Sequence, residues 1–247
     1  KPKKITASPE NHGTDKSQKP QETAAQNDQN IQNSTETIAA AVPHPIIDLS
    51  PEKLADYNYL LGQFYIVDSN TEADAVQINA GDFLKQDLKI TKETDTPQIL
   101  IYHSHSQETF ADSRPGERAD TVIGLGDDLQ ELLEKQYGYE VLHITEAFDM
   151  KEGCLERSRA YNYAEPVIAA ALEEHPSIQV VIDLHRDGVN GSKRLVTEIN
   201  GKPTAQIMFF NGLSRTKESG ELTSLPNPYQ AENLAFSFQM EYEAEQY

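Results

Sequence analysis

Gln98-Ile-Leu-Ile-Tyr102, followed without a break by His103-Ser-His105-Ser-Gln-Glu108, is the stretch that decides the fold and locates its candidate site. The first part is apolar without alternation, which is typical of a strand covered on both faces. Two imidazoles and a carboxylate come directly after it, where such a strand would emerge into a loop. Because side chains alternate along an extended segment, His103 and His105 would share one face.

A second run, Ile178-Gln-Val-Val-Ile-Asp183-Leu-His185-Arg186-Asp187-Gly188, repeats this arrangement, since a β-branched strand again ends in a histidine among charged residues. In open α/β sheets, ligands gather at the carboxyl ends of the strands. Zinc prefers imidazole and carboxylate ligands besides thiolate, and a catalytic site uses three protein ligands and leaves a position for water. The two strand ends can therefore converge on one zinc ion (Zn2+).

The charged residues around these histidines allow more than one role. Glu108 can reach the two histidines of its own run if the chain turns after the strand, as a ligand or as the base. Arg186 can hold a substrate carboxylate bidentately, or equally well pair with Asp183 or Asp187. Asp187 can orient a ligating imidazole by accepting its second ring N–H, or lie in water.

Helical and strand patterns alternate along the rest of the chain. This alternation predicts an α/β fold, with a mostly parallel twisted sheet and helices on both faces. Expected strands are 60–67, 98–102, 139–144, 180–184 and 206–211. Expected helices are 121–137, 157–174 with a kink or boundary at Pro166, and 233–247, with a short helix or turn at 79–84.

Composition divides the chain into two parts. Residues Lys1 to about Ala40 contain no aromatic residue and are dense in Lys, Gln, Asn, Thr, Ser and Pro. Such a segment buries too little apolar surface to offset the entropy of ordering. We therefore expect a disordered polar linker over 1–45 and a folded domain over 46–247 that holds the candidate site.

The charge balance excludes several kinds of partner. Lys+Arg 21 against Asp+Glu 40 gives a net charge of −19, which argues against nucleic acid and against an anionic membrane surface. No stretch approaches 18 consecutive apolar residues, so membrane attachment would need an anchor absent from this chain. The lone Cys154 excludes an intrachain disulfide and a cysteine-rich zinc site.

The combination of motifs resembles the stage II sporulation protein P family. The resemblance rests on Ile-Tyr-His-Ser-His-Ser-Gln-Glu-Thr-Phe, a Gly-Asp-Asp-Leu helix, Ser158-Arg-Ala-Tyr161, Ile-Asp-Leu-His185-Arg-Asp-Gly and Glu232-Asn-Leu-Ala. It implies an amidase-like fold and a zinc-dependent hydrolase that cleaves the N-acetylmuramoyl-L-alanine amide, and peptide cross-links as well, in peptidoglycan. It also implies an extracytoplasmic, cell-wall-facing place, a membrane anchor in the full-length protein, and stage II sporulation protein D as a partner during engulfment.

Carried across by position, the resemblance makes His105 and His185 the zinc histidines, with His103 a second choice for the first. Glu108 lies within the family's motif and is our choice for the third ligand, although the related amidases would place it nearer Glu117. Members of the family continue past a Tyr-Pro-Gly-Leu-like segment to a glutamate that serves as base. We therefore expect the domain to be truncated at its C-terminus, unless Glu108 is the base.

Three other readings remain open. A cell-wall-binding adaptor with a vestigial site predicts no bound metal, or metal without turnover. A phosphoesterase would need two metals about 3.5–4 Å apart, and the sequence is short of further Asp and His residues at strand ends. A Ser-His hydrolase using Ser104 or Ser106 lacks the Gly-X-Ser-X-Gly turn.

Overall fold

The computed structural model of the chain describes residues 45–92, 95–188 and 194–246. Except for Pro45, the linker predicted over 1–45 lies outside the described residues. The fold is α/β with a parallel sheet, as the sequence predicts. Within the described ranges, no helix combines the length and the apolar character needed to cross a bilayer.

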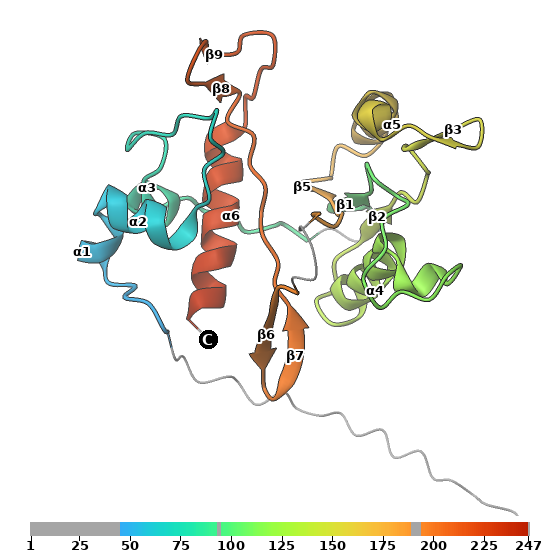
Figure 1. Ribbon diagram of the computed structural model, residues 1–247, viewed down its shortest axis with the longest axis horizontal. Helices are drawn as coiled ribbons and strands as arrows, with labels where there is room; N and C mark the ends of the chain where they lie inside the picture. The colour runs from blue at the N-terminus through green and yellow to red at the C-terminus, as the bar shows by residue number, and fades with distance from the viewer. Residues whose placement is uncertain (1–44, 93–94, 189–193, 247) are drawn as a thin grey trace, which may run out of the picture. The chain divides into compact units, whose positions relative to one another are not determined.

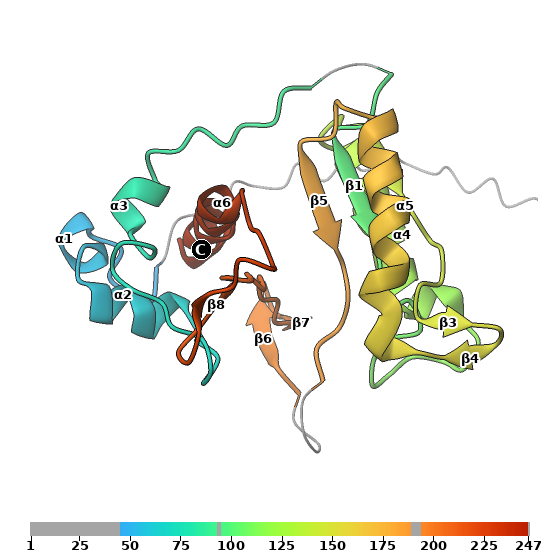
Figure 2. The same ribbon diagram turned by 90° about the horizontal axis from the view of Figure 1, so that it is seen from above.

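The sheet has three parallel strands in the order β2-β1-β5. They are β1 (Ile99–Tyr102), β2 (Val141–His143) and β5 (Val180–Asp183). Ile101 of β1 stands beside His143 on one side and Ile182 on the other. Figure 1 shows the three strands grouped together, and Figure 2 shows β1 and β5 side by side and running in the same direction. The carboxyl ends of the strands therefore meet at one edge of the sheet.

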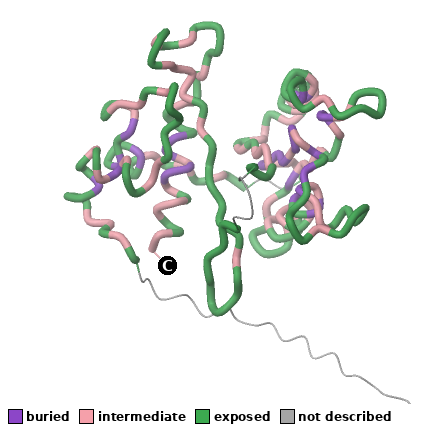
Figure 3. Tube along the Cα trace, viewed as in Figure 1, coloured by how far each residue is buried: buried purple, intermediate pink, exposed green. Residues whose placement is uncertain are grey.

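Burial explains the apolar run of β1. Ile99, Leu100 and Ile101 are at most 3% exposed, as expected for a central strand covered on both faces. β5 is more open than the sequence suggests, because Val181 is 43% exposed. Figure 3 shows how the buried positions concentrate in short stretches of the chain.

Helix α4 (Val122–Lys135) connects β1 to β2 and packs against the sheet. Its N-cap is Thr121, whose hydroxyl accepts the Gly124 N–H at 3.4 Å. Its Leu129 and Leu133 join the cluster formed by Ile99, Ile101 and Val141. Gly138 follows the helix with a φ of +67°, a left-handed conformation suited to glycine.

Helix α5 (Ala160–Glu174) connects β2 to β5 and follows the 3-10 turn η2 (Arg157–Arg159). Pro166 lies inside one continuous helix. Between β2 and η2 the chain forms a small hairpin of β3 (Met150–Lys151) and β4 (Cys154–Leu155). A second 3-10 turn, η1 (Arg118–Asp120), precedes α4.

A separate helical cluster contains α1 (Pro51–Leu54), α2 (Tyr57–Phe64), α3 (Ala80–Phe83) and α6 (Gln230–Glu245). Its core is apolar, with Phe238 of α6 in ring contact with Phe64 and Phe83 at centroid separations of 5.0 and 5.6 Å. Gln239 donates to the Phe83 carbonyl at 2.7 Å. The predicted helix over 233–247 and the short helix over 79–84 are both confirmed within the described residues.

The strand predicted over 60–67 is wrong, because most of this segment belongs to helix α2. Asp56 starts the helix by accepting the N–H groups of Asn58 and Tyr59 at 2.9 and 3.1 Å. Leu60 and Phe64 then meet the helical core at a spacing of four residues. The capping aspartate outweighs the β-forming composition of the segment.

The strand predicted over 206–211 is also wrong. The extended pairing lies just before it, in the hairpin of β6 (Val196–Ile199) and β7 (Lys202–Ala205). Asn200 and Gly201 form its turn with φ values of +52° and +74°. Asn-Gly between β-forming segments is a strong hairpin signal that the sequence analysis missed. A further short hairpin joins β8 (Arg215–Thr216) to β9 (Gly220–Glu221).

Candidate metal centre

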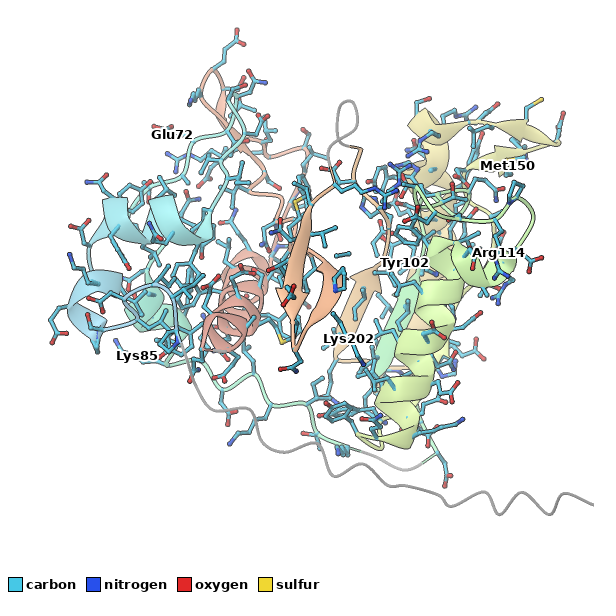
Figure 4. The ribbon with its side chains drawn as sticks, turned by 60° about the horizontal axis from the view of Figure 1, so that its bottom comes forward. Glu72, Lys85, Tyr102, Arg114, Met150 and Lys202 are labelled. Carbon is cyan, nitrogen blue, oxygen red and sulfur yellow. The ribbon has the colours of Figure 1, made fainter. Side chains whose placement is uncertain are left out.

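The candidate site is formed by the two loops that follow β1 and β5. Tyr102, labelled in Figure 4, is the last residue of β1 and marks where the first loop begins. The second loop begins after Asp183, whose Oδ1 accepts the Ser104 N–H at 2.9 Å. This bond ties the start of one loop to the end of the other strand, because parallel neighbours end at the same edge.

His105 and His185 come together across these loops. Their ring centroids are 5.6 Å apart, with an interplanar angle of 73°. Nδ1 of His105 is buried and has no hydrogen-bond partner. A buried ring nitrogen without a partner is costly in an ordinary protein interior. It fits a position where the nitrogen would bind a metal ion.

Glu108 lies within reach of the same site. It is 4% exposed, and its Oε2 is 3.7 Å from Nδ1 of His185. Its Oε1 pairs with Nη2 of Arg157, and its Oε2 accepts the Arg186 N–H at 2.6 Å. Arg157 therefore holds one oxygen of the carboxylate, and the backbone of the loop after β5 holds the other.

The donors approach one another without forming a finished coordination sphere. Among the described residues, no three His, Cys, Asp or Glu side chains already converge in an arrangement that would hold a metal ion. Each carboxylate oxygen of Glu108 is engaged by one donor. Because each oxygen has two lone pairs, these bonds leave the carboxylate able to bind a metal ion.

His103 is placed differently from His105. It is fully buried, and its Nδ1 lies 2.6 Å from the Leu184 carbonyl. Since a carbonyl only accepts, this nitrogen carries the proton. Nε2 lies 2.8 Å from Nε2 of His143, whose Nδ1 is 3.2 Å from Oδ1 of Asp127. Both ring nitrogens of His103 thus have protein partners, which argues against its role as a ligand.

Burial lowers the pKa of both members of this inner pair. For His103, burial outweighs the carbonyl of Leu184, which acts in the opposite direction. For His143, burial is again the largest cause, and the neighbouring His103 lowers the pKa further. At the same edge, burial raises the pKa of the Tyr102 hydroxyl, and Asp183 adds to the effect.

Gly126 makes room for the inner pair. A Cβ at this position of α4 would lie 2.7 Å from Nε2 of His143 and 2.9 Å from Nε2 of His103. Real Cβ atoms do not approach so closely, so any side chain at this position would force the imidazoles apart. Gly124-Leu-Gly126 therefore serves close packing of α4.

Asp149 is a site residue that the sequence analysis missed. Its side chain is fully buried, and its Oδ1 accepts the Ser106 hydroxyl at 2.6 Å. Its Oδ2 accepts the Gln107 N–H at 3.2 Å. Ser106 therefore anchors the loop and is not aligned as a nucleophile. No local sequence pattern around Asp149 predicts these hydrogen bonds, because they join residues more than 40 positions apart.

The remaining predicted residues lie at the margin of the site or outside it. Glu117 is exposed, and its backbone bonds stay within the turn formed with Arg114 and Asp120. Oδ1 of Asp187 accepts the Gly188 N–H at 2.8 Å, which is a turn contact. The Arg186 guanidinium is 3.4 Å from the Asp187 carbonyl, so the ion pairs considered for it are not the contacts observed.

Comparison with known proteins assigns the chain to a family. The sequence model described as "Stage II sporulation protein P" matches residues 1–247. The stage II sporulation protein P of Bacillus subtilis (strain 168) is 28% identical over 128 residues, which are 48% of this chain and 31% of that protein. The alignment thus spans less than half of the relative's length, and no solved structure matches the chain at a significant level. Because the family model covers the whole chain, this protein belongs to the stage II sporulation protein P family.

Proposed function

We propose that this chain is part of a zinc-dependent peptidoglycan hydrolase that acts in sporulation. In this proposal His105, His185 and Glu108 hold the zinc ion. The observation that carries it is the buried, unpartnered Nδ1 of His105, in a ring whose centroid lies 5.6 Å from that of His185. Two imidazoles and a carboxylate are a common ligand set of catalytic zinc.

When bound, zinc would lower the pKa of a bound water to about 7 and polarise the scissile carbonyl. The protein's own groups would hold the ligands and the substrate. Glu108 supplies the carboxylate, and the Arg186 N–H keeps that carboxylate at the site. The exposed guanidinium of Arg186 would bind a carboxylate of a stem peptide, because its planar fork matches two oxygens. Asp187 shapes the turn that carries Arg186.

The substrate and the cellular setting in this proposal follow from family membership. The bond cleaved would be the N-acetylmuramoyl-L-alanine amide, together with peptide cross-links. The protein would act outside the cytoplasmic membrane on the cell wall, attached through a membrane anchor in its full-length form, with stage II sporulation protein D as its partner. The acidic net charge agrees with a substrate other than nucleic acid.

The proposed fold is amidase-like, with helices on both faces of the sheet. The connection from β1 through α4 leads to β2, on one side of β1, and the connection from β2 through α5 leads to β5, on the other. Parallel crossovers are right-handed in about 98% of cases. Two right-handed crossovers in opposite directions would put α4 and α5 on opposite faces.

The test measures metal content and cell-wall hydrolysis on the same preparations. Zinc would be determined by elemental analysis of the wild-type chain and of His105→Ala, His185→Ala and Glu108→Gln. His175→Ala is the matched control, because His175 lies at the end of α5 and its N–H bonds to Ala171. Release of soluble muropeptides from purified peptidoglycan would be followed for each variant.

We expect about one zinc per wild-type chain, loss of zinc in both site histidine variants, and an unchanged control. Muropeptide release should disappear with the zinc. A wild-type chain that takes up no zinc under metal-replete conditions would overturn the hydrolase proposal and favour the adaptor reading. Zinc retained equally in all variants would show that the ion binds elsewhere.

A further inference from the structure

The β3–β4 hairpin has a fixed base close to the candidate site. The Glu156 N–H donates to the carbonyl of Asp149 at 2.8 Å and closes the hairpin below its two short strands. Glu152 and Gly153 form its turn with φ values of +51° and +81°. Met150, labelled in Figure 4, marks the start of β3, immediately after Asp149. Asp149 and Arg157 therefore flank the closed base.

Asp149 fastens the first site loop to this base. Its carboxylate is fully buried and receives the Ser106 hydroxyl on one oxygen and the Gln107 N–H on the other. A buried carboxylate is tolerated only when it is well hydrogen-bonded or paired. Both hydrogen bonds to the Asp149 carboxylate come from the two residues just before Glu108. Asp149 therefore sets the path of the chain into Glu108.

Arg157 completes the attachment on the other side of the base. Its Nη2 pairs with Oε1 of Glu108, and its side chain remains 46% exposed. The other oxygen of Glu108 accepts the Arg186 N–H from the loop after β5. Glu108 is thus held between the hairpin base and the second site loop.

We propose that Asp149 and Arg157 are positioning residues that use the base of the β3–β4 hairpin to hold Glu108 at the metal centre. This inference rests on the proposed function, in which Glu108 is a zinc ligand. Groups that hydrogen-bond to a metal ligand orient it, and their loss typically weakens metal binding by 10–100-fold. Neither residue contacts the metal or the substrate in this proposal.

The test uses the full chain with Asp149→Asn, Arg157→Met and Arg157→Lys. Asn keeps the size of Asp149 and one acceptor oxygen, whereas Lys keeps the charge of Arg157. Arg159→Met is the matched control, because Arg159 is in the same 3-10 turn and is 63% exposed. Its guanidinium lies 3.9 Å from Glu156 and 5.1 Å from the centroid of the Tyr163 ring. Thermal unfolding of each variant would identify those that remain folded.

Two readouts report the position of Glu108. The first is hydrogen exchange of the Arg186 backbone amide in the metal-free protein, because that amide donates to Glu108. Glu108→Gln is the reference for a weakened acceptor. The second is the zinc dissociation constant, measured by competition with a chelator of known affinity. The first readout does not depend on zinc, so it separates the positioning role from the proposed function.

We expect Asp149→Asn and Arg157→Met to speed exchange of the Arg186 amide about tenfold and to weaken zinc binding by about 10–100-fold. Arg157→Lys should recover part of both effects, and Arg159→Met should match the wild type. Wild-type exchange in both Asp149→Asn and Arg157→Met would overturn the positioning role. If these variants exchange faster but the wild-type chain binds no zinc, the positioning role is supported and the metal centre is refuted.

If Asp149→Asn does not fold, Ser106→Ala replaces it. This variant removes the hydroxyl that Asp149 accepts, which also accepts the side-chain amide of Gln107, and leaves the bond from the Gln107 backbone N–H in place. We expect a smaller acceleration of Arg186 exchange, about two- to fivefold. Arg157→Met changes a half-exposed side chain and provides the second, independent arm. Unchanged exchange in both would overturn the proposal.

Discussion

Two pairs of histidines lie at the same edge of the sheet and differ in how their ring nitrogens are used. In the inner pair, His103 bonds to the Leu184 carbonyl and to His143, whose Nδ1 lies 3.2 Å from Oδ1 of Asp127. In the outer pair, His105 has a buried nitrogen without a partner and His185 is exposed. His103 and His105, two positions apart in one motif, therefore differ in whether their ring nitrogens are hydrogen-bonded within the protein.

The use of the ring nitrogens separates histidines that stabilise the fold from histidines that are available to bind a metal ion. The inner pair links the end of β1 to the end of β2 and to the chain after β5 through hydrogen bonds, and His143 lies beside Asp127 of α4. A buried polar network of this kind specifies one arrangement of the core when it is satisfied. The outer pair keeps a buried ring nitrogen, Nδ1 of His105, without a hydrogen-bond partner. The inner pair should thus govern stability and the outer pair should govern zinc binding.

The largest effect should follow from His103→Ala. The variant leaves the Leu184 carbonyl and His143 without their partner and opens a cavity in a fully buried position. We expect a loss of about 3–5 kcal/mol in the free energy of unfolding, measured by urea denaturation. A loss below about 1 kcal/mol would show that the inner pair is not structural.

His105→Ala should reverse this pattern. We expect the metal-free variant to unfold within about 1 kcal/mol of the wild type, since no hydrogen bond is lost at Nδ1. Zinc at 100 times its dissociation constant should add about 2.7 kcal/mol to the wild type and nothing to the variant. Equal zinc stabilisation of both proteins, measured by thermal or urea unfolding, would contradict the assignment of the outer pair.

Gly126→Ala tests the space reserved for the inner pair. The added methyl would lie within 3 Å of both imidazoles, so we expect a loss of about 1–3 kcal/mol in the free energy of unfolding. The matched control is Gly62→Ala in α2, where the new Cβ would meet nothing within 4 Å beyond its chain neighbours and the backbone of its own helix. There the helix propensity of alanine should stabilise the protein by about 0.5–1 kcal/mol. A neutral Gly126→Ala would mean that the pair has room to shift.

The pH dependence of stability should come partly from the inner pair. The pKa values of His103 and His143 are below the ordinary value of 6.5, mainly through burial. The unfolded chain therefore binds more protons than the folded one just below that pH, and stability falls as the pH is lowered through this window. His143→Gln should fall less steeply than the wild type between about pH 7 and 5 in metal-free urea titrations. Identical slopes would refute this contribution.

The smallest effect should be that of Glu117→Gln. Its side chain is exposed and its backbone bonds belong to a local turn. We expect a change within about 0.5 kcal/mol in unfolding free energy and no change in zinc affinity. A marked loss of zinc binding would transfer the role of third ligand from Glu108 to Glu117.

The parts of the fold that the sequence predicted are those with a local signal. Continuous apolar residues mark β1, and Thr121 and Gly138 mark the ends of the α4 region. Where a local signal was overlooked, the prediction was wrong. Asp56 starts a helix in a segment predicted to be a strand, and Asn200-Gly201 directs the strand pairing to 196–205. Both features were present in the sequence and act over only a few residues.

By itself, the sequence determined the parallel α/β arrangement and placed two histidine-bearing loops at strand ends, because periodicity and chain order act locally. Only the tertiary structure decided which histidine of His103-Ser-His105 is structural. That choice depends on His143 and Leu184, which come from other elements and meet His103 only when the sheet forms. The role of Asp149 beside Glu108 has the same origin, since hydrogen bonds between distant residues leave no pattern in one chain.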